Sequence, residues 1–352
     1  MRHGSNIDPP NRFESLHREA DLENLEWDQE YLHGLTNRKI EYIDDASKTI
    51  ISENSSPDIP FRYSLNPYRG CIHSCSYCYA RPTHEYLGFN AGLDFETKIV
   101  VKRDAAILFR QFLAKKNWQP EPIMFSGVTD CYQPAEREFR LTRACVEVAA
   151  ECRQPIGIIT KNALIVRDLD LLQSMAQERL LIAAISITTL DRQLAQAMEP
   201  RTSTPEARLR TISLLSEAGI PVQLMLAPII VGLNDTEIPA ILRAGREAGA
   251  MTAGYQLLRL PLTVLPVFEE WLARTQPLKA EAVMSKIRST RDGKSSDSQF
   301  GRRMSGQGVI ADSVRKTFEV FRKKLGYQTQ LPARDSTRFQ PPVPDSGQLR
   351  LF

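Results

Sequence analysis

Histidine and long apolar runs are both scarce in this chain of 352 residues. Its five histidines all lie at or before His84. An imidazole base or metal ligand therefore cannot come from the segments after that position, which argues against hydrolase triads and histidine-rich metal sites there. No apolar run approaches the roughly 20 residues that a membrane-spanning helix needs, so we expect no membrane association.

Features of an exported, disulfide-bonded protein are also missing. Six cysteines occur in a chain that does not open with a secretory segment, and a chain of this length can bury a core without disulfide bonds. The apolar fraction of 42% and the charged fraction of 25% are those of a soluble globular protein. We expect reduced cysteines and a cytoplasmic location.

Three of the cysteines form the most informative motif, Cys71-x-x-x-Cys75-x-x-Cys78, on a short loop that follows Gly70. Thiolate is the ligand that iron–sulfur clusters use, so three thiols can hold three corners of a 4Fe-4S cube. The fourth iron then has an open coordination position, as working metal sites do. Two other interpretations remain at this point: a zinc site completed by a ligand such as His73, or free thiols.

The spacing of the motif, with Tyr77 just before its last cysteine, resembles the signature of the radical S-adenosylmethionine (SAM) superfamily. This resemblance implies that Cys71, Cys75 and Cys78 bind a 4Fe-4S cluster. It also implies that the open iron chelates the amino and carboxylate groups of SAM, and that an electron from the cluster cleaves SAM to a 5′-deoxyadenosyl radical. An electron donor such as flavodoxin or ferredoxin is then an expected partner.

Further segments resemble one subfamily, the DNA-repair-photolyase-like radical SAM proteins, which are related to spore photoproduct lyase. The resemblance extends over about residues 11–326 and is most specific around the cysteine loop. The segments that carry it are 11–14, 58–61, 66–81, 81–88 and 94–96. The resemblance suggests lyase-like radical chemistry.

A strand–helix rhythm follows Pro60. Short apolar runs alternate with helical patterns, which predicts a parallel sheet covered by helices on its outer face. Six such units give the expected fold, an α/β protein with a partial, open (β/α)6 TIM-like barrel, whose chemistry lies at the carboxyl ends of the strands. The expected strands lie at about residues 61–65, 122–127, 155–160, 181–187, 221–227 and 254–258. The expected helices lie at about 136–152, 164–176, 203–219 and 234–248, and the third begins with a capping hydroxyl and a proline in its first turn.

The chain divides into four expected regions on composition. The first, 1–56, is an acidic amino-terminal extension, and 57–279 is the radical SAM core barrel. A helical basic region follows at 280–330. The last region, 331–352, is proline-rich and is expected to be a disordered tail.

Residues for SAM binding follow from the resemblance. Ser126, Lys161 and Ser186 match positions that contact SAM in spore photoproduct lyase, and they lie near the ends of the second, third and fourth expected strands. Hydroxyl groups suit ribose and carboxylate oxygens, and a lysine suits the methionine carboxylate. For each serine, an ordinary hydrogen bond at the end of a strand is the structural alternative.

Five more positions have expected roles at the cofactor. Gly127 and Asp130 could let the backbone approach the amino group of SAM, although a plain glycine turn explains them as well. Tyr79 could cover the adenine. Arg208, together with Arg201, could pair with the SAM carboxylate through a guanidinium, or could form surface salt bridges.

One position departs from the subfamily pattern. Spore photoproduct lyase has a hydrogen-donating cysteine two residues before the serine that matches Ser126, and Met124 stands there in this chain. Cys131 lies on the same expected loop and is our candidate catalytic hydrogen-atom donor. Cys145 and Cys152 fall on an apolar helix face and are expected in the core. Thymine-dimer repair is therefore disfavoured against hydrogen abstraction from another substrate.

Charge is distributed unevenly along the chain. Residues 1–60 carry thirteen Asp/Glu against six Lys/Arg, and residues 285–326 carry eleven Lys/Arg against four Asp/Glu. A basic segment can contact nucleic acid, or the two ends of the chain can neutralise each other. The leading function is thus a radical SAM enzyme acting on nucleic acid or another macromolecule. The alternatives are radical chemistry on a small molecule or peptide, and a zinc-stabilised nucleic-acid-binding module.

Overall fold

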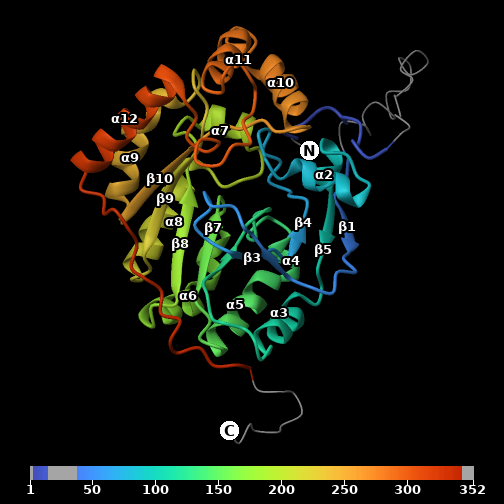
Figure 1. The fold of residues 1–352 in the computed structure, drawn as a ribbon, viewed down its shortest axis with the longest axis vertical. Helices are drawn as coiled ribbons and strands as arrows, with labels where there is room; N and C mark the ends of the chain where they lie inside the picture. The colour runs from blue at the N-terminus through green and yellow to red at the C-terminus, as the bar shows by residue number, and fades with distance from the viewer. Residues whose placement is uncertain (1–2, 15–37, 343–352) are drawn as a thin grey trace, which may run out of the picture.

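A computed structural model describes residues 3–14 and 38–342 (Figure 1). Its main sheet has seven strands in the order β10-β9-β8-β7-β6-β3-β2, of which all except β2 run parallel to their neighbours. The strands are β2 (Ile51–Glu53), β3 (Tyr63–Leu65), β6 (Ile123–Phe125), β7 (Ile156–Thr160), β8 (Leu181–Ser186), β9 (Val222–Ile229) and β10 (Thr252–Leu257). The six parallel strands are the six that the sequence predicts.

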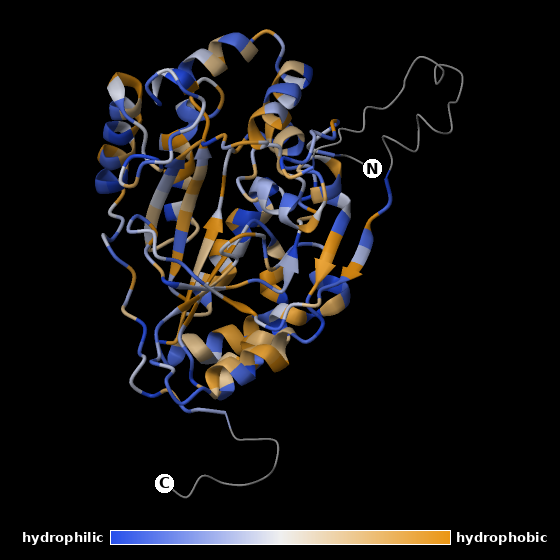
Figure 2. Cartoon of the chain, turned by 45° about the vertical axis from the view of Figure 1, so that its right-hand side comes forward, coloured by the Kyte–Doolittle hydropathy of each residue, from blue (hydrophilic) through white to orange (hydrophobic). Residues whose placement is uncertain are grey.

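Helices between these strands cover one face of the sheet. They are α3 (Ala105–Leu113), α4 (Glu136–Phe139), α5 (Leu141–Glu151), α6 (Leu169–Gln177), α8 (Pro205–Glu217) and α9 (Ile238–Glu247). Helix α7 (Arg192–Met198) lies instead at the carboxyl ends of the strands (Figure 1), where Leu194 and Met198 pack with Cys75 and Tyr77. The predicted start of α8 is confirmed, because the Thr204 side chain accepts a hydrogen bond from the Ala207 backbone and Pro205 occupies the first turn. Figure 2 shows apolar residues concentrated on the central strands and on the adjacent helices.

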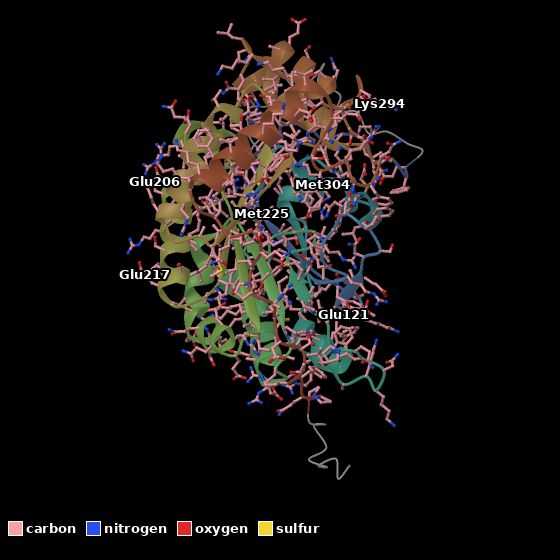
Figure 3. The ribbon with its side chains drawn as sticks, turned by 60° about the vertical axis from the view of Figure 1, so that its left-hand side comes forward. Glu121, Glu206, Glu217, Met225, Lys294 and Met304 are labelled. Carbon is pink, nitrogen blue, oxygen red and sulfur yellow. The ribbon has the colours of Figure 1, made fainter. Side chains whose placement is uncertain are left out.

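The two faces of the main sheet differ in composition. Side chains alternate between the faces along each strand. Toward the helices, the strands present large apolar side chains that are 0–1% exposed: Ile123, Phe125, Ile156, Ile158, Leu181, Ala183, Ile185, Leu224 and Leu226. We call the other side the inner face; it carries Ser64, Met124, Gly157, Ile159, Ile182, Ser186, Gln223 and Met225, several of them only half-buried. In Figure 3, Met225 lies near the centre of the molecule, whereas Glu206 and Glu217 of α8 lie at its edge.

Three expected helices are interrupted. The pattern predicts one helix over 136–152, but Arg140 takes a left-handed φ of 51° and separates α4 from α5. The segment expected as a helix from Leu164 begins as the 3-10 helix η3 (Ala163–Asp168) before α6, and α9 follows the 3-10 helix η4 (Asp235–Glu237). Apolar spacing therefore located each helix and missed its first turn.

A second, smaller sheet was not predicted. It contains β1 (Glu41–Asp44), β5 (Lys98–Val101) and β4 (Tyr68–Arg69) in the order β1-β5-β4. The described parts of the expected extension 1–56 thus contribute β1 to this sheet and β2 to the main sheet, while residues 15–37 lie outside the described part of the chain. Short helical elements η1 (Arg81–Thr83), η2 (Glu85–Leu87) and α2 (Leu93–Thr97) lie between β4 and β5.

The carboxyl-terminal region is helical, as predicted, with α10 (Val264–Thr275), α11 (Ala280–Ser289) and α12 (Gly308–Lys324). The expectation of disorder is wrong for residues 331–342. The Asp335 and Gln340 backbone N–H groups donate to the Arg179 and Cys152 carbonyl oxygens at 2.9 and 2.8 Å, and Phe339 packs against the core. Residues 343–352 lie outside the described range. Within that range, no helix has both the length and the apolar composition to cross a membrane.

Candidate iron–sulfur and SAM site

The cysteine motif lies on a loop directly after β4, which we call the cluster loop (residues 70–78). Gly70 begins it with a φ of +75°, and a Cβ there would lie 2.9 Å from the Lys98 carbonyl oxygen. The close approach lets the Cys71 backbone N–H donate to the Phe95 carbonyl oxygen at 2.9 Å. The Cys78 N–H donates to the Cys75 carbonyl oxygen at 3.3 Å, which coils the loop. Only glycine fits the backbone at the start of this coil.

All three thiols are free, with Cys71 and Cys75 buried and Cys78 partly exposed. Burial raises the pKa of Cys75, and it raises the pKa of Cys78 to about 11. Forming a thiolate in this buried environment is therefore unfavourable. A bound metal deprotonates a coordinating thiol outright, so metal binding offsets that cost. In residues 3–14 and 38–342, no group of three or more His, Cys, Asp or Glu side chains is arranged to hold a single metal ion.

This arrangement fits a cluster and does not fit a zinc site. Zinc requires its ligands at about 2.0–2.3 Å from one ion, whereas each thiolate of a cube binds a different iron. The expected fourth zinc ligand, His73, is engaged elsewhere: its Nδ1 lies 3.4 Å from Asp130 Oδ2 and its Nε2 lies 3.0 Å from Asn162 Nδ2. The donor set available on the loop is three thiols alone.

A buried ion pair holds the cluster loop from one side. Arg81 donates to the Cys75 carbonyl oxygen through Nε at 3.1 Å and Nη2 at 2.8 Å, and Nη2 also contacts Glu96 Oε1 at 2.6 Å. Arg81 and Glu96 are both 0% exposed. Glu96 also accepts hydrogen bonds from the Gly4 and Ser5 backbone N–H groups. The chain's first described residues are thereby fixed against the loop.

A second buried ion pair holds the loop from the opposite side. Glu199 accepts hydrogen bonds from the Tyr77 hydroxyl, from Thr188 Oγ1 at 2.6 Å, and from Arg208 Nη2. Arg208 donates further to the carbonyl oxygens of Ser186 and Ser203, at 3.0 and 2.8 Å. Its guanidinium, 1% exposed, is thus engaged by the protein itself. The predicted contact of Arg208 with SAM is not supported, because Arg208 acts here by positioning Glu199 and Tyr77.

Lys161 follows β7 and brings a positive charge to the cluster loop. Its Nζ lies 3.3 Å from the Ala227 carbonyl oxygen and 5.9 Å from the centre of the Tyr77 ring. Burial lowers the pKa of Lys161, while the nearby Cys75 acts in the opposite direction. Ser186 ends the neighbouring strand β8 and is 3% exposed. The two residues lie at the carboxyl ends of adjacent strands, where the sequence places them.

Asp130 orients the backbone around Lys161 at the carboxyl end of β7. Its carboxylate accepts hydrogen bonds from the Lys161 backbone N–H at 2.8 Å and from Thr160 Oγ1 at 2.8 and 3.0 Å. Although burial opposes ionisation, His73 and these hydrogen bonds hold the pKa of Asp130 below its ordinary value. The carboxylate thus fixes the backbone from which Lys161 projects.

Tyr79, Ser126 and Gly127 lie close together next to this corner. The Tyr79 hydroxyl donates to the Gly127 carbonyl oxygen at 3.0 Å, and the ring is 52% exposed. Ser126 takes a left-handed φ of 77°, and its Oγ accepts a hydrogen bond from the Cys131 backbone N–H at 2.8 Å. A Cβ on Gly127 would lie 2.6 Å from the Ser64 Cβ, so this glycine permits close packing against β3. The predicted grouping of these residues is consistent with the fold.

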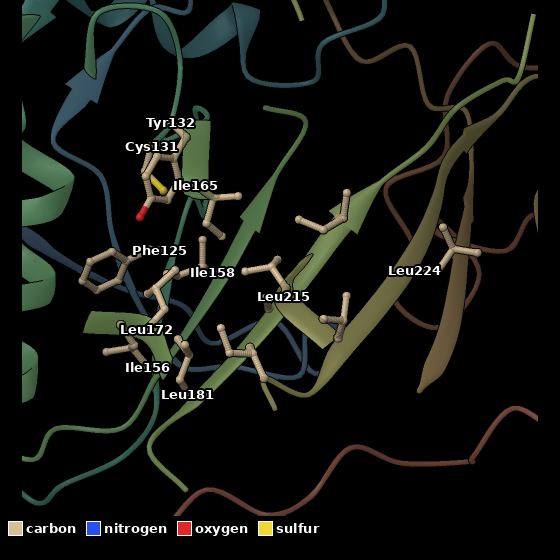
Figure 4. Close-up of a cluster of buried hydrophobic side chains, with 14 of the residues drawn as sticks. Phe125, Cys131, Tyr132, Ile156, Ile158, Ile165, Leu172, Leu181, Leu215 and Leu224 are labelled. Atoms are coloured by element: carbon tan, nitrogen blue, oxygen red, sulfur yellow. The ribbon is translucent and has the colours of Figure 1, made fainter. Parts of the chain in front are cut away.

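Cys131 lies in the wrong environment for a hydrogen donor. Its side chain is 0% exposed and packs with Phe125 and Tyr132 in the core between sheet and helices (Figure 4). Burial raises the pKa of this thiol well above its ordinary value. The loop position suggested access to the site, but the side chain turns toward the outer core. Met124 instead occupies the inner face.

Other contacts at the site had no sequence signal. Arg201 Nη2 lies 3.2 Å from His3 Nδ1, beside the cluster loop. The pairs Arg81–Glu96 and Arg208–Glu199 join residues that read as ordinary surface charges in the sequence. Because hydrophobic periodicity carries no information about which charges become buried partners, these pairs emerge only from the three-dimensional arrangement.

The fold and the three-thiol loop define a radical SAM protein, and comparison with known proteins agrees. The sequence model of the Radical SAM superfamily matches residues 65–244. The chain therefore belongs to this superfamily of enzymes, whose cofactors are a 4Fe-4S cluster and SAM. The predicted family and cofactors are confirmed.

Similar proteins have been found in bacteria and archaea. An uncharacterized protein of Mycobacterium tuberculosis is 38% identical over 221 residues, which cover 62% of this chain and 65% of that protein, just under two thirds of its length. An uncharacterized protein of Methanocaldococcus jannaschii is 28% identical over 250 residues, covering 71% of this chain and 89% of that protein.

Solved structures of spore photoproduct lyase share the fold. The lyase complexed with dinucleoside spore photoproduct superposes with a TM-score of 0.60 at 15% identity, covering 81% of this chain and 79% of that chain. A variant of the same lyase gives a TM-score of 0.61 at 14% identity, covering 90% and 86% of the two chains. The mixed α/β architecture with a parallel sheet is thus that of a radical SAM protein.

Proposed function

We propose that this protein binds SAM at a 4Fe-4S cluster held by Cys71, Cys75 and Cys78 and uses it to abstract a hydrogen atom from a substrate at the inner face. Bound there, the cluster supplies the electron that cleaves SAM to methionine and a 5′-deoxyadenosyl radical. The observation that carries the proposal is the free three-thiol loop, held between two buried ion pairs and facing Lys161.

Each of the neighbouring residues has a defined part in this proposal. Lys161 pairs with the SAM carboxylate through a charge-assisted hydrogen bond, and the Ser186 hydroxyl contacts the same ligand. Tyr79 and Gly127 lie on the side of the site that takes the adenine of SAM. Arg81 orients the cluster loop through the Cys75 carbonyl group and touches neither cofactor.

The main sheet is proposed to form the partial, open (β/α)6 barrel. Its outermost strands, β10 and β2, pair with no further strand among the described residues. An open barrel leaves a lateral entrance, and the half-buried Ile182, Gln223 and Met225 indicate that solvent reaches its interior. A low-potential protein such as flavodoxin or ferredoxin is the proposed electron donor, in the cytoplasm.

A nucleic-acid substrate is the second candidate. A group of exposed aromatic side chains and arginines near the carboxyl end of β10 favours it. Tyr79 and Phe300 are 52% and 57% exposed, and the Arg303 guanidinium lies 4.8 Å from the Phe300 ring centre. Arg259 lies beside Tyr79 and Arg303, and its Nε has no hydrogen-bond partner in the described chain. Exposed aromatic rings beside guanidinium groups suit stacking with unpaired bases.

Ion pairs reduce the expected contribution of the basic region itself. Arg303 binds Asp58 through two hydrogen bonds of 2.7 and 2.5 Å, and Arg302 contacts Asp292 and Asp297. Asp58 comes from the amino-terminal part of the chain, so mutual neutralisation of the two ends, the alternative weighed from the sequence, accounts for Arg303. We therefore base the nucleic-acid candidate on Tyr79, Arg259 and Phe300.

Anaerobic reconstitution with iron and sulfide tests the leading proposal. Reduced protein should form 5′-deoxyadenosine and methionine from SAM, measured by chromatography, even without substrate. Protein that carries four iron atoms and forms neither product would contradict the proposal. Protein that instead retains zinc through chelation and binds no iron would favour the zinc-stabilised module.

Binding of a fluorescent single-stranded oligonucleotide tests the second candidate. Affinity should fall steeply with salt, because counterions are released on association. Replacing Tyr79 with Ala should weaken binding by about 1–3 kcal/mol, as loss of one stacked base does, whereas replacing the distant exposed Tyr86 should not. Affinity that is insensitive to salt and to Tyr79→Ala would shift the substrate to a small molecule or peptide.

A further inference from the structure

The segment 331–342 crosses beneath the main sheet at the amino ends of its strands (Figure 1). Three backbone hydrogen bonds trace the path. Gln328 N–H donates to the Met251 carbonyl oxygen before β10, Asp335 N–H to Arg179 before β8, and Gln340 N–H to Cys152 before β7. The segment therefore forms a floor under the inner face, at the end of the strands opposite the cluster loop.

Arg334 projects from this floor into the inner face. Its Nη1 lies 2.9 Å from the position that a Cβ on Gly157 would occupy, and the Met124 sulfur lies equally close to that position. Gly157 faces inward, because its neighbours Ile156 and Ile158 are packed in the core on the helix side. The missing side chain at Gly157 thus provides the space in which the guanidinium lies.

One nitrogen of this guanidinium is buried without a partner, while Arg334 as a whole is half-buried. Arg334 Nη1 is shielded from solvent and makes no hydrogen bond, and no ion pair of Arg334 exists among the described residues. Burial alone lowers the pKa of Arg334 to about 10, so the group remains charged at neutral pH. A buried charge that lacks a counter-ion is costly for folding.

Two neighbouring arginines, unlike Arg334, form ion pairs with carboxylates. Arg338 contacts Asp335 at 3.2 Å and Glu178 at 3.5 Å, and Arg179 contacts Asp335 at 3.4 Å. These pairs lie on the exposed side of the same segment. Arg334 alone among these three points inward, where the described inner face presents it with no carboxylate.

We propose that Arg334 binds an oxyanion of the substrate, a phosphate or a carboxylate group, at the floor of the inner face. A guanidinium fork matches both groups in a bidentate geometry. Gly157 lies four residues before Lys161 along β7 and its continuation, which places the anion about 13 Å from the level of Lys161 at about 3.3 Å per residue. The substrate would thus carry its negative group roughly that far from the carbon that reacts.

This inference rests on the proposed function for the identity of the ligand, but its test does not require SAM cleavage. Inorganic phosphate and acetate serve as probes for the protein without SAM or reductant, at constant ionic strength against chloride. Phosphate dissociation constants from titration calorimetry should rise at least tenfold in Arg334→Met, a change of 1.4 kcal/mol or more. The matched control Arg338→Met, on the exposed side of the segment, should leave them unchanged.

Thermal unfolding separates a binding role from a structural one. If Arg334 serves to bind an anion, the variant Arg334→Met loses an unpaired buried charge. Without phosphate, it should therefore have the same melting temperature as the unchanged protein or a higher one. Gly157→Ala, whose methyl group displaces the guanidinium, should weaken phosphate binding with Arg334 still present. Stronger binding of phosphate than of acetate would assign the group as a phosphate, and the reverse order a carboxylate.

Three results would overturn the inference: no saturable binding of either anion by the unchanged protein, equal affinities in Arg334→Met and Arg338→Met, or a lower melting temperature of Arg334→Met in chloride. If the unchanged protein binds neither anion but still forms 5′-deoxyadenosine, the inference is wrong and the proposed function is unaffected. Conversely, the protein could bind the anion and fail to cleave SAM. That result would contradict the proposed function and would still support the anion site.

Discussion

The two faces of the main sheet are made by the same strands and serve opposite purposes. On β7, Ile156 and Ile158 point to the helices and are 0% and 1% exposed, whereas Gly157 leaves space on the inner face. The outer face is filled by apolar side chains that exclude water. The inner face carries small, polar and methionine side chains. Alternation along a strand thus places the packed core and the proposed substrate face one residue apart.

The cysteines divide in the same way. Cys131, Cys145 and Cys152 are 0–1% exposed in the core around the outer face. Cys71, Cys75 and Cys78 lie on a loop at the carboxyl end of the strands, next to Lys161. Residue type alone therefore does not separate the two groups of cysteines in this chain, whereas position relative to the sheet does.

The largest effect should come from exchanging a cysteine of each group. Cys75→Ala should abolish SAM cleavage and lower bound iron below four atoms per chain, because the cube then has two open corners. Cys145→Ala, in the core, should retain the iron and the activity. Iron analysis and 5′-deoxyadenosine formation measure both variants. A full four-iron complement in Cys75→Ala would refute the ligand assignment.

Breaking the buried pair that positions Tyr77 should have the next largest effect. Arg208→Met removes the ion-pair partner of the buried Glu199 carboxyl group, which costs about 3–5 kcal/mol in the free energy of unfolding. The exposed pair Arg192–Glu206 provides the control, and Arg192→Met should change stability little. Urea denaturation compares the two. Similar midpoints for both variants would show that the Arg208 network is not a structural requirement.

Two isoleucines of β8 compare the faces directly. Ile185 faces the helices and is 1% exposed, whereas Ile182 on the inner face is half-buried. Ile185→Ala should cost about 2–5 kcal/mol through lost burial and a cavity, and Ile182→Ala clearly less. The same denaturation experiment measures both. Equal losses would mean that the inner face is packed as a second core.

The smallest expected effect is on cofactor affinity. Lys161→Ala removes one charge-assisted hydrogen bond to SAM, worth about 1.5–3 kcal/mol. The SAM dissociation constant of the cluster-loaded protein should therefore rise about 10- to 150-fold. Equilibrium dialysis with labelled SAM measures it, with Lys115→Ala on the far side of α3 as the control. An unchanged constant would assign Lys161 a structural role.

The sequence was sufficient for the regular part of the fold, for the family and for its cofactors. Each parallel strand is a short apolar run, and such runs are visible without tertiary information. The cysteine spacing is local, so it also needs no tertiary information. The placement of Lys161 and Ser186 at one edge of the sheet follows from the rule that parallel strands share their carboxyl ends.

The missed features depend on contacts between distant residues. Glu96 binds Gly4, and Arg334 reaches Gly157, and nothing in the local sequence of either pair signals the contact. The expectation for Cys131 failed because a loop position does not specify which way a side chain turns. The expectation of a disordered tail failed because composition does not register the two backbone hydrogen bonds that residues 335 and 340 make to the segments before β8 and β7.

The packing of the cluster loop has a consequence for the order of events during synthesis. The loop packs against Gly4 before it and is hydrogen-bonded to Met198 and Glu199 far after it, and Arg274 of α10 contacts the Gly4 carbonyl oxygen. At roughly 5–20 residues per second, α10 leaves the ribosome roughly 10–40 s after the cysteines. During that interval the loop has its contacts with Phe95 and Arg81 but lacks those with Met198 and Glu199.

We therefore expect iron to enter the completed chain rather than the growing one. Nascent chains halted at residue 180 and at residue 330 can be compared for retained iron under identical supply. Equal retention would show that the cysteines capture the metal before their surroundings exist. Retention confined to the longer chain would make cluster insertion the last step of maturation.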